Sequence, residues 1–366
     1  MILCDSPNKH RQGTIAPMID RSYLHQLDPF AIQITQTFGL RWYGLAYIAG
    51  FIVAWVLIRW MGRKKISTID PSHAGDFIFV AVLGVLIGGR VGYCLFYDPS
   101  LLYTFTNEFP WWKLLAIQDG GMASHGGMIG VLVAFVIWGR KNKVSILHII
   151  DVGALCATPG LFFGRIANFI NGELWGKALS ANQQHGPPPW SVKYPSEITE
   201  VWIQHPQQFG EELIKLEPLQ SIVAGGNNFH QTIVSEIYAG NQTVIETVQP
   251  MLTAWYPSQL FQAATEGPLL FLALFIIWWK PRNQGIIASS FLLFYGVGRI
   301  VTEAYRQPDE GVLLIMGLSR GQLLSSFMIV SGIILLLITS KRKTQKLGGF
   351  KLAIFNQQPQ SPQKST

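Results

Sequence analysis

Seven apolar segments, each close to 20 residues long, recur along the chain and limit the folds that it can adopt. A helix needs about 20 residues to cross the hydrocarbon core of a bilayer. The chain is therefore predicted to be an all-α integral membrane protein with about seven transmembrane helices. The predicted spans are Leu40–Trp60, Ala74–Tyr97, Gly120–Trp138, Leu147–Ile170, Leu260–Trp279, Gly285–Ala304 and Gln322–Thr339.

The composition agrees with this class, because 49% of the residues are apolar and only 13% are charged. Soluble domains contain about 25% charged residues. A net charge of +7 would by itself fit a nucleic-acid binder, but the basic residues gather at the ends of the apolar segments, which favours membrane topology and no nucleic-acid partner. Cys4, Cys94 and Cys156 form no CxxC pair, which excludes a disulfide framework and a zinc site.

Basic clusters follow the first, third, fifth and seventh segments, and they predict the orientation. Loops rich in Lys and Arg stay in the cytoplasm. The N-terminus is therefore expected outside and the C-terminus inside, and no cleavable signal peptide is expected at the start. The clusters are Arg59, Arg63, Lys64 and Lys65; Arg140, Lys141 and Lys143; Lys280 and Arg282; and Lys341, Arg342, Lys343 and Lys346.

The segments divide the chain into five expected regions. Residues 1–38 form a polar lead, and 39–170 contain the first four transmembrane helices. Residues 171–256 form a small extracytoplasmic head, and 257–340 contain the last three helices. Residues 341–366 form a basic, disordered cytoplasmic tail. The sequence shows no internal repeat of fixed period.

Polar side chains within the segments converge on one depth, the outer leaflet. A charged side chain inside a bilayer costs several kcal/mol unless a partner or water compensates it. An arginine at a helix end can extend its side chain to the membrane interface. Arginines that did so independently of one another would be found at both faces of the membrane. The residues at this depth are Tyr43, Arg90, His125, Arg165, Asn168, Glu266, Arg299 and Glu303, with Glu173 and Arg306 just beyond the spans.

The stretch Gly160–Gly176 contains the densest group of these residues. Arg165 and Asn168 are three apart and share a helix face. Gly172 and Gly176 predict that the helix unwinds around Glu173.

The arginines at this depth favour an anionic ligand. Arg90, Arg165 and Arg299 each follow a glycine, which permits close approach, and a guanidinium matches phosphate oxygens in shape. The alternative is that each arginine pairs with an internal carboxylate, as Arg299 and Glu303 could at a spacing of four. The arginines outnumber the nearby carboxylates, so a phospholipid head group is the predicted ligand.

His125 lies among Gly120, Gly121, Gly126, Gly127 and Gly130. This glycine density predicts an irregular loop that lines a cavity before the third span. The histidine is either a structural hydrogen-bonding residue or a catalytic one. No metal constellation, phosphate-binding GKT/S loop or GxSxG elbow is present in the sequence.

Seven motifs resemble the prolipoprotein diacylglyceryl transferase family of bacteria, and they follow that family's order over all seven spans. The most specific is GRIANFINGELWGK at 164–177. The others are RWYGLAYIAGF at 41–51, GGRVGYCLFYDP at 88–99, DGGMASHGGMIGV at 119–131, YPSQLFQAATEG at 256–267, YGVGRIVTEAYRQPDEG at 295–311 and GQLLSSFMIVSG at 321–332.

The resemblance implies an enzyme of the bacterial cytoplasmic membrane that begins lipoprotein maturation. It would move the sn-1,2-diacylglyceryl group of phosphatidylglycerol to the lipobox cysteine of a preprolipoprotein, forming a thioether and releasing glycerol-1-phosphate without a cofactor or metal. The expected catalytic residues are His125, Arg165 and Arg299, with His125 acting as a base or orienting the lipid. The expected substrate-binding residues are Tyr43, Asn168, Glu173, Gly176, Tyr295 and Glu303, and Arg90 joins them because of its depth in the membrane rather than the resemblance.

The sequence departs from the family pattern at four positions. Ala167 replaces the usual glycine, a small-for-small change. Tyr256 replaces a histidine, and Phe261 and Gln262 replace a tyrosine and a glutamate, so these three side chains have no expected role.

Two other classes of protein share some of these features. An anionic-lipid transporter or flippase would use the same arginines, but it should show polar residues at every membrane depth and repeat symmetry, which this sequence lacks. A purely structural membrane scaffold would leave the convergence of the arginines unexplained.

Overall fold

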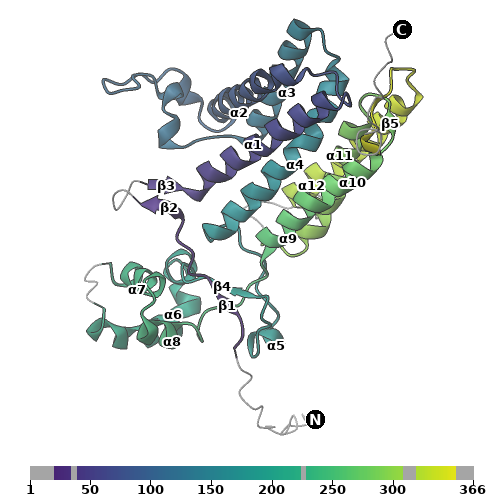
Figure 1. Cartoon of the computed structure of the whole chain (residues 1–366). Helices are drawn as coiled ribbons and strands as arrows, with labels where there is room; N and C mark the ends of the chain where they lie inside the picture. Colours follow the sequence, from purple (N-terminus) through teal and green to yellow (C-terminus); the bar gives the residue numbers. More distant parts are fainter. Residues whose placement is uncertain (1–19, 34–38, 224–227, 308–318, 352–366) are drawn as a thin grey trace, which may run out of the picture. The chain divides into compact units, whose positions relative to one another are not determined.

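The computed structural model describes residues 20–33, 39–223, 228–307 and 319–351 (Figure 1). Its contacts divide the chain into two compact units. The small unit comprises Met1–Asp28, Asn171–Ser258 and Tyr305–Gln307, and the bundle unit comprises Pro29–Ile170, Gln259–Ala304 and Pro308–Thr366. Each unit is described by itself.

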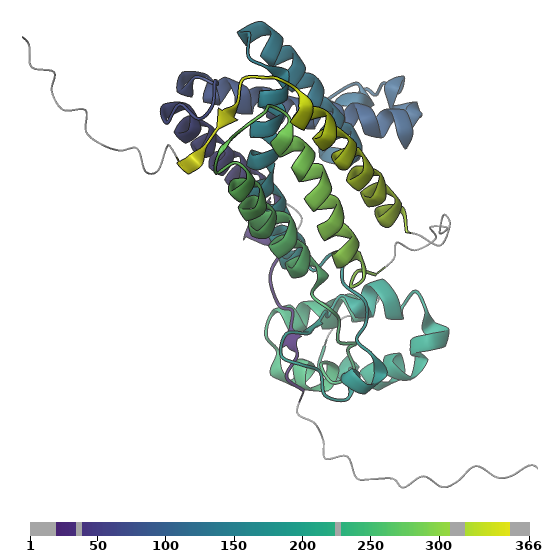
Figure 2. The same cartoon turned by 90° about the vertical axis from the view of Figure 1, so that its right-hand side faces the viewer.

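Helices build the bundle unit. They are α1 (Trp42–Arg63), α2 (Ala74–Phe96), α3 (Ser124–Asn142), α4 (Ile146–Ile170), α9 (Ser258–Ala264), α10 (Leu270–Ile277), α11 (Ile286–Glu303) and α12 (Arg320–Lys341). All but α9 and α10 are at least 18 residues long. α2 packs against α3, α1 against α4, and α11 against both α4 and α12 (Figure 1 and Figure 2). Short 3-10 helices at Pro71–His73, Pro99–Leu102, Lys113–Leu115 and Ile117–Asp119 join the first helices.

The prediction of an all-α integral membrane protein is confirmed. Among the described residues, strands occur only as short pairs, and six helical segments are long and apolar enough to cross a membrane. The third predicted span folds as α3 but is not among the six, because its polar first turn and Arg140 and Lys141 at its end lower its mean hydropathy. The count of seven therefore stays a prediction. The six segments are Trp42–Arg63, Pro71–Phe96, Ile146–Ile170, Ser258–Ile277, Ile286–Glu303 and Gly321–Lys341.

The glycines around His125 serve a different purpose from the predicted irregular loop. Gly120 and Gly121 have φ angles of +85° and +77°, so the chain is irregular there. Gly126 and Gly130, however, lie inside α3, where an added Cβ would collide with the carbonyl oxygens of Gly88 and Gly84 on α2. The prediction of a loop was wrong for these residues, because glycine in a membrane helix also allows two backbones to approach closely.

A buried carboxylate joins α4 to the start of α11. Asp151 on α4 accepts hydrogen bonds from the backbone N–H groups of Gly285 (2.6 Å) and Ala288 (2.8 Å). A helix leaves its first N–H groups without internal partners, and a carboxylate there satisfies them. Asp151 therefore fixes two helices relative to each other at the end opposite to Arg165 and Arg299.

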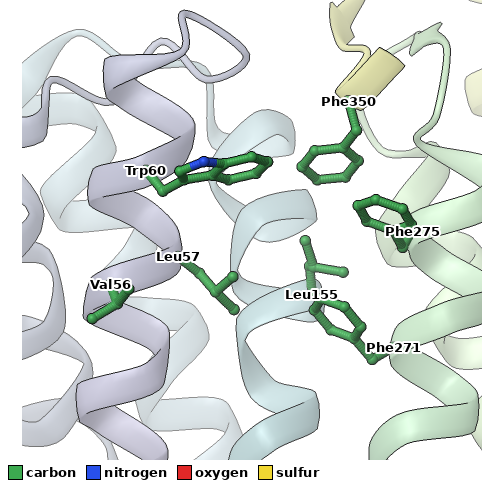
Figure 3. Close-up of a pocket in the computed structure, with 7 residues that line it drawn as sticks. All are labelled: Val56, Leu57, Trp60, Leu155, Phe271, Phe275 and Phe350. Atoms are coloured by element: carbon green, nitrogen blue, oxygen red, sulfur yellow. The ribbon is translucent and has the colours of Figure 1, made fainter. Parts of the chain in front are cut away.

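The C-terminal segment after α12 folds back on the bundle. Strand β6 (Leu347–Gly348) pairs with β5 (Pro281–Arg282) in an antiparallel manner. Phe350, 2% exposed, then stacks between Trp60 of α1 and Phe275 of α10 (Figure 3). A second antiparallel pair, β2 (Phe30–Gln33) and β3 (Gly39–Arg41), precedes α1.

Short helices around an apolar core form the small unit. The parallel pair of β1 (Tyr23–Leu24) and β4 (Val192–Lys193) brings part of the predicted N-terminal lead into it. The helices are α5 (Ala181–Gln184), a π-helix at Ile198–Trp202, α6 (Pro206–Leu216), a 3-10 helix at Glu217–Ser221, α7 (Phe229–Tyr238) and α8 (Gln242–Val248).

Glu197 is the polar centre of this small unit. Its carboxylate accepts hydrogen bonds from the indole N–H of Trp202 (3.0 Å) and Trp255 (3.2 Å) and from the hydroxyl of Thr253 (2.6 Å). Burial raises the pKa of Glu197, and these bonds oppose the increase. The carboxylate therefore joins segments more than 50 residues apart.

Replacing Gly130 with alanine should destabilise the bundle by about 1–3 kcal/mol, because the new methyl group overlaps the backbone of α2. Gly160 in α4 is the matched control, since a Cβ there meets nothing within 4 Å. In thermal unfolding in detergent, the midpoint of Gly130→Ala should be lower than that of the parent protein. The midpoint of Gly160→Ala should not fall. Equal midpoints for the two variants would contradict a close α2–α3 contact.

Candidate active site

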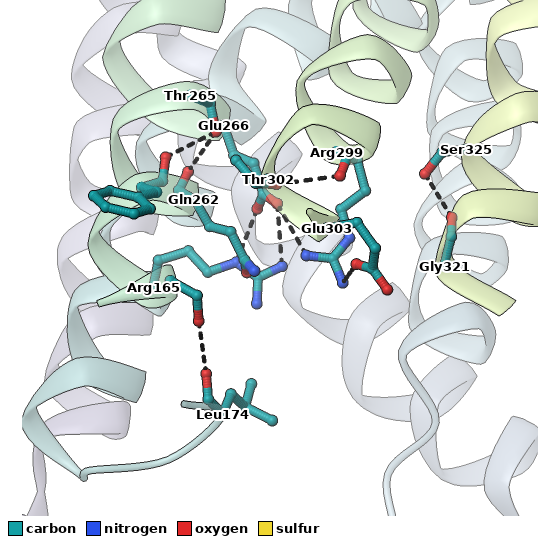
Figure 4. Close-up of polar contacts among 12 residues, drawn as sticks. Arg165, Leu174, Gln262, Thr265, Glu266, Arg299, Thr302, Glu303, Gly321 and Ser325 are labelled. Atoms are coloured by element: carbon teal, nitrogen blue, oxygen red, sulfur yellow. Dashed lines mark hydrogen bonds and ion pairs between the residues drawn. The ribbon is translucent and has the colours of Figure 1, made fainter. Parts of the chain in front are cut away.

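Glu266 is the centre of a buried cluster of charges in the bundle unit (Figure 4). Its side chain is 1% exposed. One carboxylate oxygen accepts a hydrogen bond from Nε of Arg165 at 2.9 Å, and the other from Nη2 of Arg165 at 3.3 Å. Nη1 of Arg299 lies 3.7 Å from the same carboxylate. One acidic side chain therefore holds two guanidinium groups.

Local backbone geometry directs Glu266 into the cluster. It lies in a π-helical turn, Thr265–Leu269, between α9 and α10. Pro268 in this turn has no N–H group for an α-helical hydrogen bond, which favours a break in the regular ladder. Such single π-turns occur often at functional sites, because they rotate the following side chains relative to the preceding ones.

A second ion pair continues the cluster along α11. Arg299 and Glu303 are four residues apart, and their Nη2 and Oε2 atoms are separated by 3.3 Å, so the alternative of an internal ion pair holds for this arginine. Ser319 donates a hydrogen bond to the other oxygen of Glu303 at 3.0 Å and also caps α12. The cluster therefore joins α4, the π-turn, α11 and α12.

Two tyrosines extend the cluster. The side-chain amide of Asn168 donates a hydrogen bond to the hydroxyl of Tyr43, which links α4 to the first turn of α1. The hydroxyl of Tyr295 interacts with the guanidinium of Arg165. Tyr43, Arg165, Asn168, Tyr295, Arg299 and Glu303, all predicted from the sequence, thus lie together at one end of the bundle.

The predicted excess of arginines is absent from this cluster. Arg165 and Arg299 meet two carboxylates, Glu266 and Glu303, so the formal charges balance. The expected excess also included Arg90, which binds backbone carbonyls, and Arg306, which belongs to the small unit. A phosphate would therefore meet guanidinium groups that carboxylates already hold in place.

Arg90 does not join the cluster and instead anchors a loop. Its guanidinium is 5% exposed and donates to the backbone carbonyls of Lys113 (2.5 Å), Leu114 (2.8 Å), Gly120 (2.6 Å) and Gly121 (3.1 Å). These bonds use most of its five N–H donors. Arg90 thus fixes the segment that leads to His125.

His125 lies apart from the ion pairs. It is exposed in the first turn of α3, and within the described part of the chain it makes no hydrogen bond or ion pair with the cluster.

Glu173 and Gly176 belong to the small unit. α4 ends at Ile170 and Gly172 has a φ of +63°, which confirms that the helix unwinds before Glu173. Glu173 is exposed, and its charge adds to burial in raising the pKa of Glu200. Gly176 packs against the backbone oxygens of Tyr256 and Tyr305, where a Cβ would not fit.

Glu266 is a site residue that was not predicted from the sequence, although its carboxylate is one of the charges expected at this depth. The available signal was that Glu266 is the sole acidic residue between 257 and 280, within a predicted span. Of the positions that depart from the family pattern, Phe261 and Gln262 offer backbone oxygens to the hydroxyl of Thr265, and Tyr256 stacks on Trp190. Among the described residues, no three His, Cys, Asp or Glu side chains gather as a metal site would require.

The fold and the cluster define a multi-pass membrane protein that holds paired arginines and carboxylates at one end of its helical bundle. A sequence model described as prolipoprotein diacylglyceryl transferase matches residues 29–338, which is most of the chain. The chain therefore belongs to the prolipoprotein diacylglyceryl transferase family and is a transferase.

Three relatives illustrate the similarity, and each is a phosphatidylglycerol--prolipoprotein diacylglyceryl transferase. The protein of Bdellovibrio bacteriovorus is 41% identical over 350 residues, covering 90% of this chain and 97% of the relative. That of Xylella fastidiosa is 35% identical and covers 86% and 93%. That of Psychrobacter arcticus is 35% identical and covers 87% and 95%.

Replacing Glu266 with methionine should destabilise the protein by about 3–5 kcal/mol, because Arg165 and Arg299 then lose their shared carboxylate in a buried site. The double variant Arg165→Met/Glu266→Met should regain part of this loss, since Arg299 keeps Glu303. Unfolding midpoints of both variants in detergent test the coupling. Additive losses would show that the two side chains do not interact.

Proposed function

We propose that this chain transfers the sn-1,2-diacylglyceryl group of phosphatidylglycerol to the lipobox cysteine of a preprolipoprotein. Membership of the family over residues 29–338 carries this proposal, because the relatives are named for this donor and acceptor. The cluster around Glu266 supplies a chemical basis, since a lipid phosphate needs cations at the depth of the head groups.

The reaction that we propose is a displacement at carbon. The cysteine loses its thiol proton to a base, and the thiolate sulfur attacks the glycerol carbon bonded to the phosphate oxygen. A C–S bond forms as the C–O bond breaks, and the electron pair of that bond leaves with glycerol-1-phosphate. The products are a thioether on the acceptor and a phosphate with one more negative charge on its leaving oxygen.

Arg165 and Arg299 would stabilise that developing charge. Their guanidinium groups are held by Glu266 before any substrate arrives, so little reorganisation is required during the reaction. Glu303 and Tyr295 would support the two arginines from α11, and Asn168 with Tyr43 would bind head-group hydroxyls. Arg90 would act by shaping the loop before α3.

His125, Glu173 and Gly176 receive roles from the family motifs in which they lie. We assign His125 the role of base for the thiol, with orientation of the lipid as the competing role. Glu173 and Gly176 would bind substrate in the chain that follows α4.

The proposed location is the bacterial cytoplasmic (inner) membrane, with the N-terminus outside and the C-terminus in the cytoplasm. Basic residues at the ends of α1, α3 and α12 and after α10 support this orientation. Residues 171–256 would then form the extracytoplasmic head, on the side where the acceptor is expected. A transporter or flippase for anionic lipids is not favoured, because the relatives are named transferases.

Purified protein given labelled phosphatidylglycerol and a lipobox peptide should form a thioether peptide and glycerol-1-phosphate. Arg165→Ala should lower kcat/KM about 100-fold or more while the protein still inserts, because one phosphate ligand is lost. Arg165→Lys, the control that keeps the charge but not the planar fork, should retain more activity. Lipid movement across the bilayer without either product would refute the transferase proposal.

The pH dependence of transfer separates the two roles of His125. As a base it must be neutral, so kcat/KM should fall at acidic pH, and His125→Gln should remove this limb and lower kcat by about 100-fold or more. A histidine that only orients lipid would instead raise KM for phosphatidylglycerol when replaced, with the acidic limb retained. Transfer rates measured by mass spectrometry between about pH 5 and 8, where an unperturbed imidazole changes its charge, give the acidic limb and the KM for phosphatidylglycerol.

A further inference from the structure

An apolar cavity of about 250 Å³ lies between α1 and α10, in front of α4 (Figure 3). Every residue that lines it is aliphatic or aromatic, so it favours hydrocarbon over any polar group. The lining includes Leu57, Trp60, Leu155, Phe271, Phe275 and Phe350.

The cavity reaches the surface of the helical bundle, which is expected to face lipid. α4 packs against both α1 and α10 and forms the back wall. Val56, at the mouth on α1, is 51% exposed. A chain of methylene groups can therefore enter from the bilayer without displacing a helix.

The C-terminal segment closes one end of the cavity. Phe350 bridges α1 and α10, with ring centroids 5.6 Å from Trp60 and 4.6 Å from Phe275. The backbone N–H of Lys351 donates to the carbonyl of Trp279 at 3.1 Å, which holds this residue at the end of α10. The sequence match to the family ends at residue 338, so this closure is formed by residues beyond it.

Three lysines adjoin residues of the closed end. Lys64 directly follows α1, and its backbone N–H donates to the carbonyl of Trp60 at 3.0 Å, while Lys280 follows Trp279 and Lys351 follows Phe350. None of the three forms an ion pair with another described residue. Asp70, the acidic residue of the α1–α2 loop, accepts hydrogen bonds from Ser72. Lysine stems can lie along apolar surface while their ammonium groups reach a phosphate.

We propose that this cavity binds one acyl chain of an anionic phospholipid whose phosphate contacts Lys64, Lys280 and Lys351. Basic residues between transmembrane helices are a recurrent means of holding such head groups. The site is separate from the arginine cluster, since Leu155 and Arg165 are ten residues apart on α4, about 15 Å along its axis. The lipid would join α1, α10 and the C-terminal segment.

Cross-linking tests this site through binding, independently of the transfer reaction. The full chain is placed in phosphatidylcholine nanodiscs that contain a small fraction of phosphatidylserine with a diazirine in its acyl chain. Irradiation should label peptides from 56–60 and 270–277, and the same probe on phosphatidylcholine should label them at least fivefold less. Equal labelling by the two probes would overturn the proposal, and so would uniform labelling of all lipid-facing helices.

Variants locate the two halves of the site. The triple variant Lys64→Gln/Lys280→Gln/Lys351→Gln should reduce labelling at least fivefold, because it removes the phosphate contacts. The single variant Val56→Trp should reduce labelling to the same extent, because the indole fills the mouth of the cavity. Ile137→Trp, on the exposed face of α3, is the matched control and should label as the parent does. Arg165→Ala should also leave the labelling unchanged. A loss of labelling in Arg165→Ala would assign the lipid to the arginine cluster and refute a second site.

Discussion

The pairing of Glu266 with Arg165 and Arg299 is the interaction on which the membrane-embedded part of this protein depends. A buried carboxylate without a partner costs several kcal/mol, and each buried guanidinium group adds a similar cost. The cluster offsets these costs only when three elements keep one arrangement. They are α4, α11 and the π-turn that precedes α10. The same requirement that stabilises the bundle therefore also places two cations, already oriented, where a lipid phosphate is expected.

Supporting contacts hold that arrangement from both ends of the helices. Asp151 caps α11 and joins it to α4, far from the cluster, while Ser319 joins α12 to Glu303 beside it. Glycines let α2 and α3 approach closely, and Arg90 fixes the loop between them through backbone carbonyls. Each contact satisfies a polar group or removes a clash, so the cluster rests on several independent constraints.

The two ends of the bundle differ in chemistry. One end holds balanced ion pairs and tyrosines, suited to a polar head group and a reaction. The other holds an aromatic bridge through Phe350, an apolar cavity and adjoining lysines, suited to holding a lipid in place. If the basic clusters orient the chain as proposed, the reaction and the lipid anchor face opposite leaflets.

The sequence by itself determined the features that depend on near neighbours. Hydrophobic length predicted the helices, Gly172 predicted the end of α4, and contiguous motifs indicated the family. A spacing of four allowed the pair of Arg299 and Glu303 as an alternative to a bound ligand. Only the tertiary structure decided the rest. Arg165 and Glu266 are 101 residues apart in the sequence. Arg90 binds backbone carbonyl groups, and because every residue has one, the sequence does not mark them as partners. Periodicity and spacing describe one helix at a time, so they cannot show which helices meet or which charge compensates another.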